Sequence, residues 1–301
     1  MQLSGVCDNS ALAWIGKYAA AYSYQNEAGI QKTILRYTLP FSEEQDAILV
    51  YKHKMTPEQR ASYYQTLVQG IQRNIAITRL LKNNGVNSIL TFDAVEQERE
   101  TETGRNNIYI QTEAVQPIWN VLFQREVNIL TLLDVFIRLS IIVRDISTDP
   151  SAVHHRGICM DEIYLTVDKK IRLGGFYYAT APGYSQAVPY LPDQATHLPP
   201  ALIDGDVGSA GTDMQTLARM LFNILSGLPW DTQWPELPRI APAFAPEGLA
   251  EILKHGMACT DAECNRFRRR LLDFRKYLSK TALASFMVPV YEPFRKEYSY
   301  E

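Results

Sequence analysis

The side chains best suited to chemistry gather in one short stretch near the middle of the chain. Asp161 and Glu162 are adjacent carboxylates that could hold a cation, although we favour a solvent-exposed acidic pair. His154 and His155 could bind a metal ion, but no third ligand stands at a suitable spacing, so we expect His155 to be packed in the interior. Cys159 has a single basic neighbour in sequence, which favours an unreactive thiol over a redox-sensitive one. We therefore predict no metal site here.

A helix, a loop and a hairpin are predicted to position this stretch. Residues 127–146 are strongly apolar but are interrupted by charges, which is typical of a buried amphipathic helix and not of a membrane span. The loop covers 154–162, and two short strands follow at 163–167 and 170–174. A segment rich in proline, glycine and tyrosine, 177–210, comes next, and loops of that length are usually functional or regulatory.

The first half of the chain is predicted to form a small sheet with one inserted helix. Runs of β-branched and aromatic residues predict four strands, at 31–39, 46–54, 88–95 and 107–112. A capping box at Thr56 starts a helix that ends near Asn83. Residues 1–25 receive no assignment. In the second half, a helix begins at Thr212 or Asp213 and ends before Gly227, and residues 246–283 are helical.

Composition excludes several classes of protein. The 301 residues carry a net charge of −3 and are 46% hydrophobic, which is ordinary for a globular chain and gives no general attraction for nucleic acid or anionic membranes. Four cysteines without a C-x-x-C pair favour reduced thiols in a cytoplasmic protein. Four arginines lie at helical spacing, and we expect a solvated face with one buried structural arginine: Arg266, Arg268, Arg269 and Arg270.

The stretch from His155 to Gly175 reads HRGICMDEIYLTVDKKIRLGG and is followed by Phe176. It resembles the segment of the protein kinase family that runs from the catalytic loop, through two short strands, to the D-F-G motif. Three further matches occur in the expected order: Val50-Tyr51-Lys52 resembles the lysine strand, Thr212-Asp213-Met214 the start of the large buried helix, and Arg266 a late arginine.

The resemblance implies a bilobal α+β fold. Residues 1–115 would form a small, mostly β N-lobe with one long helix, including the unassigned segment 1–25. Residues 116–301 would form a larger, mostly α C-lobe. The hinge between the lobes would fall near Glu113 to Gln116.

The resemblance also implies that the chain is a pseudokinase, a degenerate serine/threonine protein kinase. Gly157 stands where the family has the carboxylate that accepts the proton, and Cys159 where it has a phosphate-contacting lysine. Glu162 replaces a metal-binding asparagine, and Gly175 replaces the aspartate of D-F-G that holds Mg²⁺. Asn74 replaces the helix glutamate that pairs with the lysine.

Nucleotide binding is left open by these positions. Lys52 could contact phosphates, but Gly16 and Gly29 are the only glycines near the expected phosphate-binding loop. We expect no cofactor, with ATP bound without Mg²⁺ as one alternative. A transferase with a rearranged site, using Asp161, Glu162 or Asp168 to hold a metal, is the other.

Packing residues are retained where catalytic ones are not. In the family the equivalents of His155 and Phe176 stack between the lobes, and that of Asp213 hydrogen-bonds the catalytic-loop backbone. The usual glutamate partner of Arg266 is absent from Pro199-Pro200-Ala201, and Asp204 or Asp206 could replace it.

The resemblance implies a regulatory scaffold that binds another protein, such as a signalling kinase, a phosphopeptide-reading domain or a secretion component. A homodimer is left open, and no nucleic acid is expected as a partner. Several hydroxyl side chains of the 177–210 segment could be phosphorylated, although we favour a protein contact surface. They are Tyr177, Tyr178, Thr180, Tyr184, Ser185, Tyr190 and Thr196.

Overall fold

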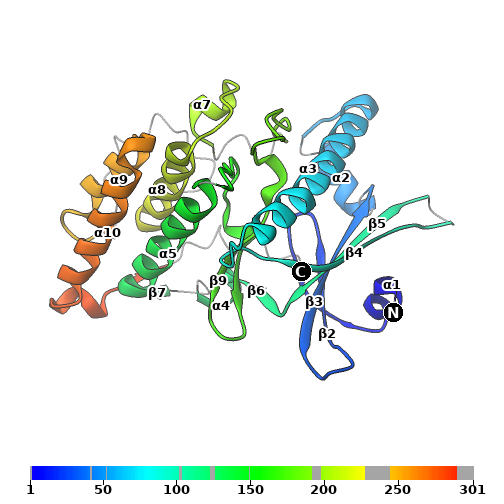
Figure 1. Ribbon diagram of the computed structural model, residues 1–301, viewed down its shortest axis with the longest axis horizontal. Coiled ribbons are helices and arrows are strands. Elements are labelled where there is room, and N and C mark those ends of the chain that lie inside the picture. The colour runs from blue at the N-terminus through cyan, green and yellow to red at the C-terminus, as the bar shows by residue number, and fades with distance from the viewer. Residues whose placement is uncertain are drawn as a thin grey trace.

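A computed structural model describes residues 2–40, 43–51, 53–101, 104–122, 126–148, 150–191, 198–227 and 245–289. The fold is mixed α+β. Figure 1 shows an antiparallel sheet at one end of the molecule and most of the helices at the other, with the long helix α3 (Pro57–Asn83) beside the sheet. Within the described residues, no helix is both long and apolar enough to cross a membrane.

The larger sheet has five antiparallel strands in the order β1-β2-β3-β5-β4. Its strands are β1 (Ala11–Ile15), β2 (Ala20–Gln25), β3 (Gln31–Leu39), β4 (Phe92–Arg99) and β5 (Asn106–Glu113). The short helix α1 (Leu3–Asp8) packs through Leu3 and Cys7 against Ile34 and Tyr109. The unassigned N-terminal residues therefore supply a helix and the first two strands.

The prediction of a strand at 46–54 is wrong, because Glu43–Tyr51 form helix α2. Strand β3 already pairs with β2 on one side and β5 on the other, so a strand directly after it could not form a hairpin with β3. The apolar run instead buries Leu49 in the core beneath the sheet. Lys52, which was expected to lie in this strand, is outside the described residues.

The strand predicted at 88–95 starts later than expected. Strand β4 begins at Phe92, whereas Ile89 and Leu90 reach the second half of the chain. The Leu90 N–H donates a hydrogen bond to the Leu173 carbonyl at 2.9 Å, and Ile89 forms an isolated bridge with Leu173. These two apolar residues are buried between the two halves, which is why they do not extend β4.

Helix α3 is confirmed together with its cap. The Thr56 hydroxyl accepts the Gln59 N–H at 3.3 Å, and the Gln59 side chain accepts the Thr56 N–H at 2.8 Å. Helix α8 (Ala210–Ser226) has an equivalent box between Ser209 and Thr212, and Gly227 ends it in the left-handed conformation.

The other half contains the remaining helices and two small sheets. The helices are α4 (Ile118–Leu122), α5 (Ile129–Ser147), α7 (Pro200–Ile203), α9 (Leu249–Met257) and α10 (Cys264–Leu278), with 3₁₀ turns η1 (Met160–Glu162), η2 (Phe176–Tyr178), η4 (Asp261–Glu263) and η5 (Ala282–Ser285). One sheet has the order β6-β8-β9 and the other pairs β10 with β7. Their strands are β6 (Val115–Pro117), β7 (Glu126–Asn128), β8 (Ile163–Thr166), β9 (Ile171–Leu173) and β10 (Met287–Pro289). The predicted helix at 127–146 and the hairpin after it are thereby confirmed.

Two large hydrophobic cores hold these parts together. One is centred on α5 and α8 in the helical half. The other lies beneath the five-stranded sheet and includes Leu35, Leu67 and Ile71 together with Tyr164 and Tyr177 of the helical half. The second core therefore crosses from one half to the other and fixes how they face each other.

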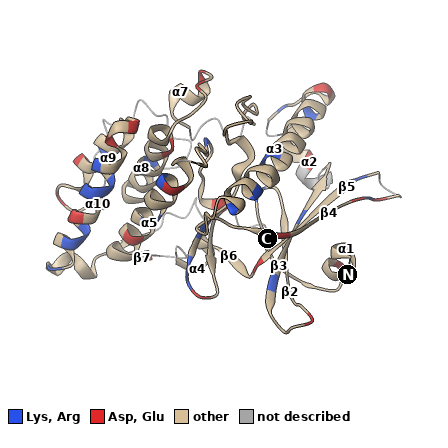
Figure 2. Cartoon of the chain, viewed as in Figure 1, with Lys and Arg blue, Asp and Glu red and all other residues tan. Residues whose placement is uncertain are grey.

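The expectation of a buried arginine in the 266–270 cluster is wrong. Helix α10 buries Phe267, Leu271 and Leu278, and Arg266 precedes this stripe and is exposed. The other three arginines of the cluster are exposed or half-buried, and Figure 2 shows the basic residues of α10. Among the described residues, the buried arginines are Arg156 and Arg219.

Candidate functional site

The loop before η1 is held by a buried carboxylate of helix α8. Asp213 accepts the His155 N–H at 2.7 Å on Oδ2 and the Arg156 N–H at 2.8 Å on Oδ1. Burial raises the pKa of Asp213 to about 7, although the two backbone hydrogen bonds favour its ionised form. The contact is the one expected for Asp213 from the sequence, and it ties the loop to the helical core.

His155 is packed and neutral. Its Nε2 lies 2.7 Å from the Gly174 carbonyl oxygen, which can only accept, so Nε2 carries the proton. The imidazole packs on the Phe176 ring with 4.7 Å between centroids. Burial lowers the pKa of His155 to about 4. His155 therefore contributes packing and one hydrogen bond, and it is not placed as a metal ligand.

Gly157 has no room for a carboxylate. A Cβ built at this position would lie 2.8 Å from Cδ2 of the Tyr178 ring, and Tyr178 is itself buried. The aromatic ring of Tyr178 thus fills the space into which a side chain at 157 would project.

Gly175 is filled in the same way by Glu162. Gly175 has a φ of +73°, and a Cβ there would lie 2.6 Å from the Glu162 Cδ and closer still to its Cγ. The Glu162 carboxylate accepts the Tyr164 hydroxyl at 3.0 Å and also bonds Tyr177. A carboxylate from position 162 therefore occupies the place of a side chain at 175.

The expectation of a solvent-exposed acidic pair is wrong. Asp161 and Glu162 are only 6% and 7% exposed. Both lie in η1, directly before strand β8, and no local sequence pattern indicates their burial. Burial, and then the Asp161 charge, raise the pKa of Glu162 to about 7.

The raised pKa of Glu162 predicts a pH-dependent stability. Its folded pKa of about 7 lies above the ordinary 4.5, so its contribution is fully present below pH 4.5 and is lost as the pH rises through 7. We expect Glu162→Gln to remove up to ~3 kcal/mol of the loss between pH 5 and pH 8, at about 1.4 kcal/mol per pKa unit. Denaturant unfolding at each pH measures this.

Comparing the wild type with Glu162→Gln isolates the contribution of Glu162 to the pH dependence, because Asp213 titrates near the same pH in both proteins. Asp93→Asn, at a surface carboxylate paired with Lys32, serves as the control and should keep the wild-type slope. Identical slopes for wild type and Glu162→Gln would contradict the burial of an ionisable Glu162.

A lysine that the sequence analysis missed faces this site. Lys17 lies in the turn between β1 and β2, and its charge lowers the pKa of both Glu162 and Cys159. Its ammonium also lies 5.5 Å from the centre of the Tyr18 ring. Burial nevertheless keeps the pKa of Cys159 well above its ordinary value, which agrees with an unreactive thiol.

Aromatic side chains fill the space between the sheet and the loop. Trp14 packs on Tyr164 with 5.9 Å between centroids, and Tyr18 meets Tyr177 edge-on at 5.5 Å. The Tyr37 and Tyr177 hydroxyls lie 2.9 Å apart, and burial raises the pKa of Tyr37. We call Trp14, Tyr18, Tyr37, Tyr164 and Tyr177 the aromatic cluster; all five are buried.

The expected phosphate contacts are not assembled by the described residues. Strand β3 precedes α3 and points Tyr37, not a lysine, toward the aromatic cluster. Asn74, on α3, accepts the Phe176 N–H on its Oδ1 at 3.0 Å. Gly70 allows η2 to lie directly against α3, because a Cβ there would be 3.2 Å from the Tyr177 Cβ.

Two arginines fix the segment after η2. Arg73 of α3 donates to the Ala179 carbonyl at 2.8 Å and the Gln186 carbonyl at 3.0 Å, and Arg156 donates to the Tyr178 carbonyl at 2.9 Å. Of the hydroxyl side chains considered for phosphorylation, three are buried, two are exposed, one is half-buried and one lies outside the described residues. In that order they are Tyr177, Tyr178 and Thr180; Tyr184 and Ser185; Tyr190; and Thr196.

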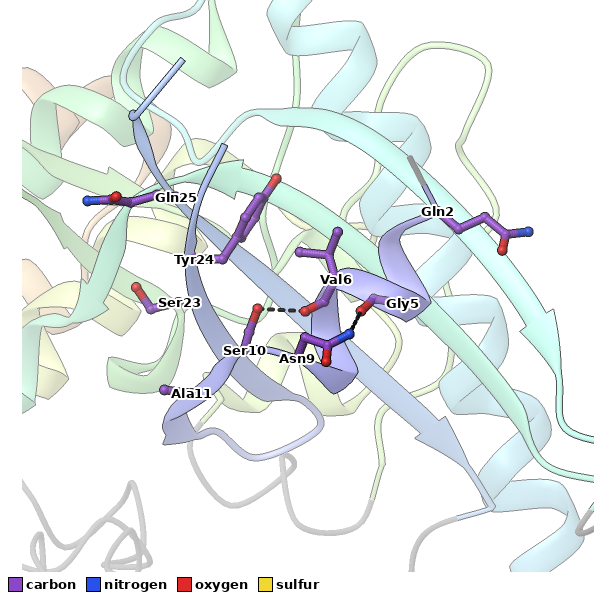
Figure 3. A pocket seen from close by; sticks show the side chains of 9 residues that line it. All are labelled: Gln2, Gly5, Val6, Asn9, Ser10, Ala11, Ser23, Tyr24 and Gln25. Carbon is purple, nitrogen blue, oxygen red and sulfur yellow. Dashed lines mark hydrogen bonds between the residues drawn. The ribbon is translucent and has the colours of Figure 1, made fainter. Parts of the chain in front are cut away.

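A separate open groove of about 680 Å³ lies between α1 and the first two strands. Figure 3 shows Ser10 bonded to the Val6 carbonyl and Asn9 bonded to the Gly5 carbonyl within it. Its lining carries no charged side chain, and these two polar groups are used within the chain. The groove therefore offers a ligand hydroxyl and amide groups only.

Among the described residues, no group of three or more histidine, cysteine, aspartate or glutamate side chains is arranged to hold a metal ion. The chain matches no model of a known protein family and no curated protein. Its function must therefore be argued from the site itself.

Proposed function

We propose that the chain has a protein kinase-like fold, with an N-lobe at 1–115 and a C-lobe at 116–301, and that it is a pseudokinase. It acts as a binding or regulatory module for another protein and does not transfer phosphate. The strand order of the five-stranded sheet, the helix α3 between β3 and β4, and the contact of Asp213 with the His155 loop support this assignment.

The observation that carries the proposal is the filling of two glycine positions. The resemblance requires carboxylates at 157 and 175, one to accept a proton and one to hold Mg²⁺. Tyr178 fills the first space and Glu162 the second. Glu162 is turned toward tyrosine hydroxyls, so its oxygens are used within the fold.

Protein binding is supported by the outer surface of the 177–210 segment. Val207 and Ile203 are large apolar side chains with more than half of their surface exposed, and Tyr184 is 37% exposed. The Thr180 hydroxyl donates to the Val207 carbonyl, which brings these stretches together. Such exposed apolar and tyrosine side chains suit a protein interface. The partner classes are a signalling kinase or a phosphopeptide-reading domain, and the location is cytoplasmic.

One observation favours a second candidate, metal-independent nucleotide binding. Lys17 brings a positive charge to the turn where a phosphate-binding loop would lie. This candidate uses Lys17 in place of the expected Lys52 and requires the aromatic cluster to open.

Incubation with γ-labelled ATP and Mg²⁺ or Mn²⁺ tests the main proposal. We expect no label on the chain or on generic protein and peptide acceptors, because both carboxylate positions are filled. Incorporation that Glu162→Gln abolishes, and that the surface control Asp93→Asn retains, would overturn the proposal and assign chemistry to a rearranged site.

A further inference from the structure

Two thiols of the helical half lie side by side. The Sγ atoms of Cys259 and Cys264 are 3.8 Å apart, and neither cysteine is in a disulfide. Cys259 follows helix α9, Cys264 is the first residue of α10, and the turn η4 separates them. A disulfide needs the sulfur atoms about 2.05 Å apart, so closure requires a movement of under 2 Å within one short turn.

The two thiols have different environments and therefore different expected reactivities. Cys264 is partly exposed and begins a fifteen-residue helix, where a thiolate is favoured. The Cys259 thiol donates a hydrogen bond to Cys264, which lowers the pKa of Cys264 against its partial burial and the charges of Asp261 and Asp213. Cys259 is 1% exposed, and the same hydrogen bond, together with burial, raises its own pKa. Cys264 is therefore the accessible nucleophile and Cys259 the adjacent resolving thiol.

We propose that Cys259 and Cys264 are a redox modification site that forms a reversible intramolecular disulfide with a hydroperoxide as oxidant. The Cys264 thiolate attacks the terminal peroxide oxygen, the O–O bond breaks, and the leaving alkoxide or hydroxide takes a proton. The Cys259 sulfur then attacks the resulting sulfenic acid, the S–O bond breaks, and the Cys259 proton leaves with the hydroxide as water. Two thiols and one hydroperoxide give one disulfide, one alcohol or water, and one water.

The turn that carries the thiols is bonded to the start of helix α8. The Gly211 N–H donates to Asp261 Oδ1 at 2.6 Å, and the Gln215 side chain donates to the Cys259 carbonyl at 2.8 Å. A Cβ at Gly211 would be 3.0 Å from atoms of this turn. Closing the disulfide therefore moves the first turn of the helix that carries Asp213, and oxidation should shift the melting temperature.

The test treats the reduced, folded chain with equimolar hydrogen peroxide and analyses it without reduction. We expect the intact protein to lose the mass of two hydrogen atoms, a peptide map to join Cys259 to Cys264, and dithiothreitol to reverse both the cross-link and the shift in melting temperature. The double variant Cys7→Ser/Cys159→Ser should behave as wild type.

Cys264→Ser should lose the cross-link while keeping the melting temperature of the reduced wild type. The proposal is overturned if wild type gains oxygen at Cys264 without forming the cross-link. It is also overturned if the peroxide modifies neither cysteine, or if the same mass loss persists in Cys264→Ser. The peptide map of the wild-type protein tests for the cross-link even where a variant folds poorly.

Discussion

Gly175→Asp is expected to destabilise the fold by about 3–5 kcal/mol and not to create a metal site. The φ of +73° costs a non-glycine residue roughly 1–2 kcal/mol. The new Cβ would overlap the Glu162 side chain, and such overpacking in a core costs typically 1–3 kcal/mol. A second buried carboxylate beside Glu162 adds like-charge repulsion. Denaturant unfolding measures the loss.

Gly183 provides the matched control for this substitution. It has a φ of +80°, and nothing lies within 4 Å of a Cβ built there. Gly183→Asp therefore carries the backbone strain without the overlap, and it should cost only about 1–2 kcal/mol. Combining Gly175→Asp with Glu162→Gly should recover part of the loss, because the two side chains compete for one space. Equal losses for Gly175→Asp and Gly183→Asp would show that Glu162 does not fill that space.

Asp213→Ala is expected to cost about 3–5 kcal/mol. The substitution leaves the N–H groups of His155 and Arg156 buried without an acceptor, and each bond to a charged group contributes about 1.5–3 kcal/mol. Asp213→Asn should cost less, because its carbonyl oxygen still accepts one of the two bonds. Thermal and denaturant unfolding measure both variants.

Asp204→Ala, at an exposed aspartate after α7, is the control and should change stability by less than about 0.5 kcal/mol. If Asp213→Ala were as mild as Asp204→Ala, the loop would have to be held by other contacts, and the role argued for α8 would be wrong.

Elements with strong local signals were predictable from the sequence. Helix α3 has its cap residues and apolar spacing within a single stretch, and α8 ends at a glycine in the left-handed conformation. The hairpin after η1 likewise has two short apolar runs around Asp168-Lys169. In each case the determining residues are neighbours along the chain.

The predictions that were wrong concern residues whose structure or burial depends on partners that are distant in the sequence. Residues 46–54 have strand-forming side chains, but β3 already pairs with both β2 and β5, so they cannot pair with β3 as well. The sequence suggests that Asp161 and Glu162 are a surface pair, yet both are buried in the folded chain. Arg266 lies beside the buried stripe of α10 and not within it. Burial of a polar side chain is a tertiary property, so composition and spacing could not reveal it.

Only some of the residues of the candidate site could be predicted from the sequence. The resemblance to protein kinases drew attention to Gly157 and Gly175, but the side chains that fill the spaces beside them come from positions 178 and 162. The approach of Lys17 and the contact between Tyr37 and Tyr177 join residues that are more than a hundred positions apart. The excess of tyrosine, 17 residues, was the available hint of a buried aromatic cluster.

The most direct measurement of the central claim is the melting temperature of the chain with ATP, in the presence and absence of Mg²⁺. A ligand at 100 times its Kd stabilises by ~2.7 kcal/mol, which raises the melting temperature by several degrees at roughly 2–4 °C per kcal/mol. We predict no shift under either condition. The aromatic cluster fills the space between the sheet and the loop, and Glu162 fills the space beside Gly175, so neither space is open to a nucleotide. A shift without Mg²⁺ that Lys17→Ala removes would support metal-independent nucleotide binding instead. A shift that requires Mg²⁺ and is lost in Glu162→Gln would contradict the account.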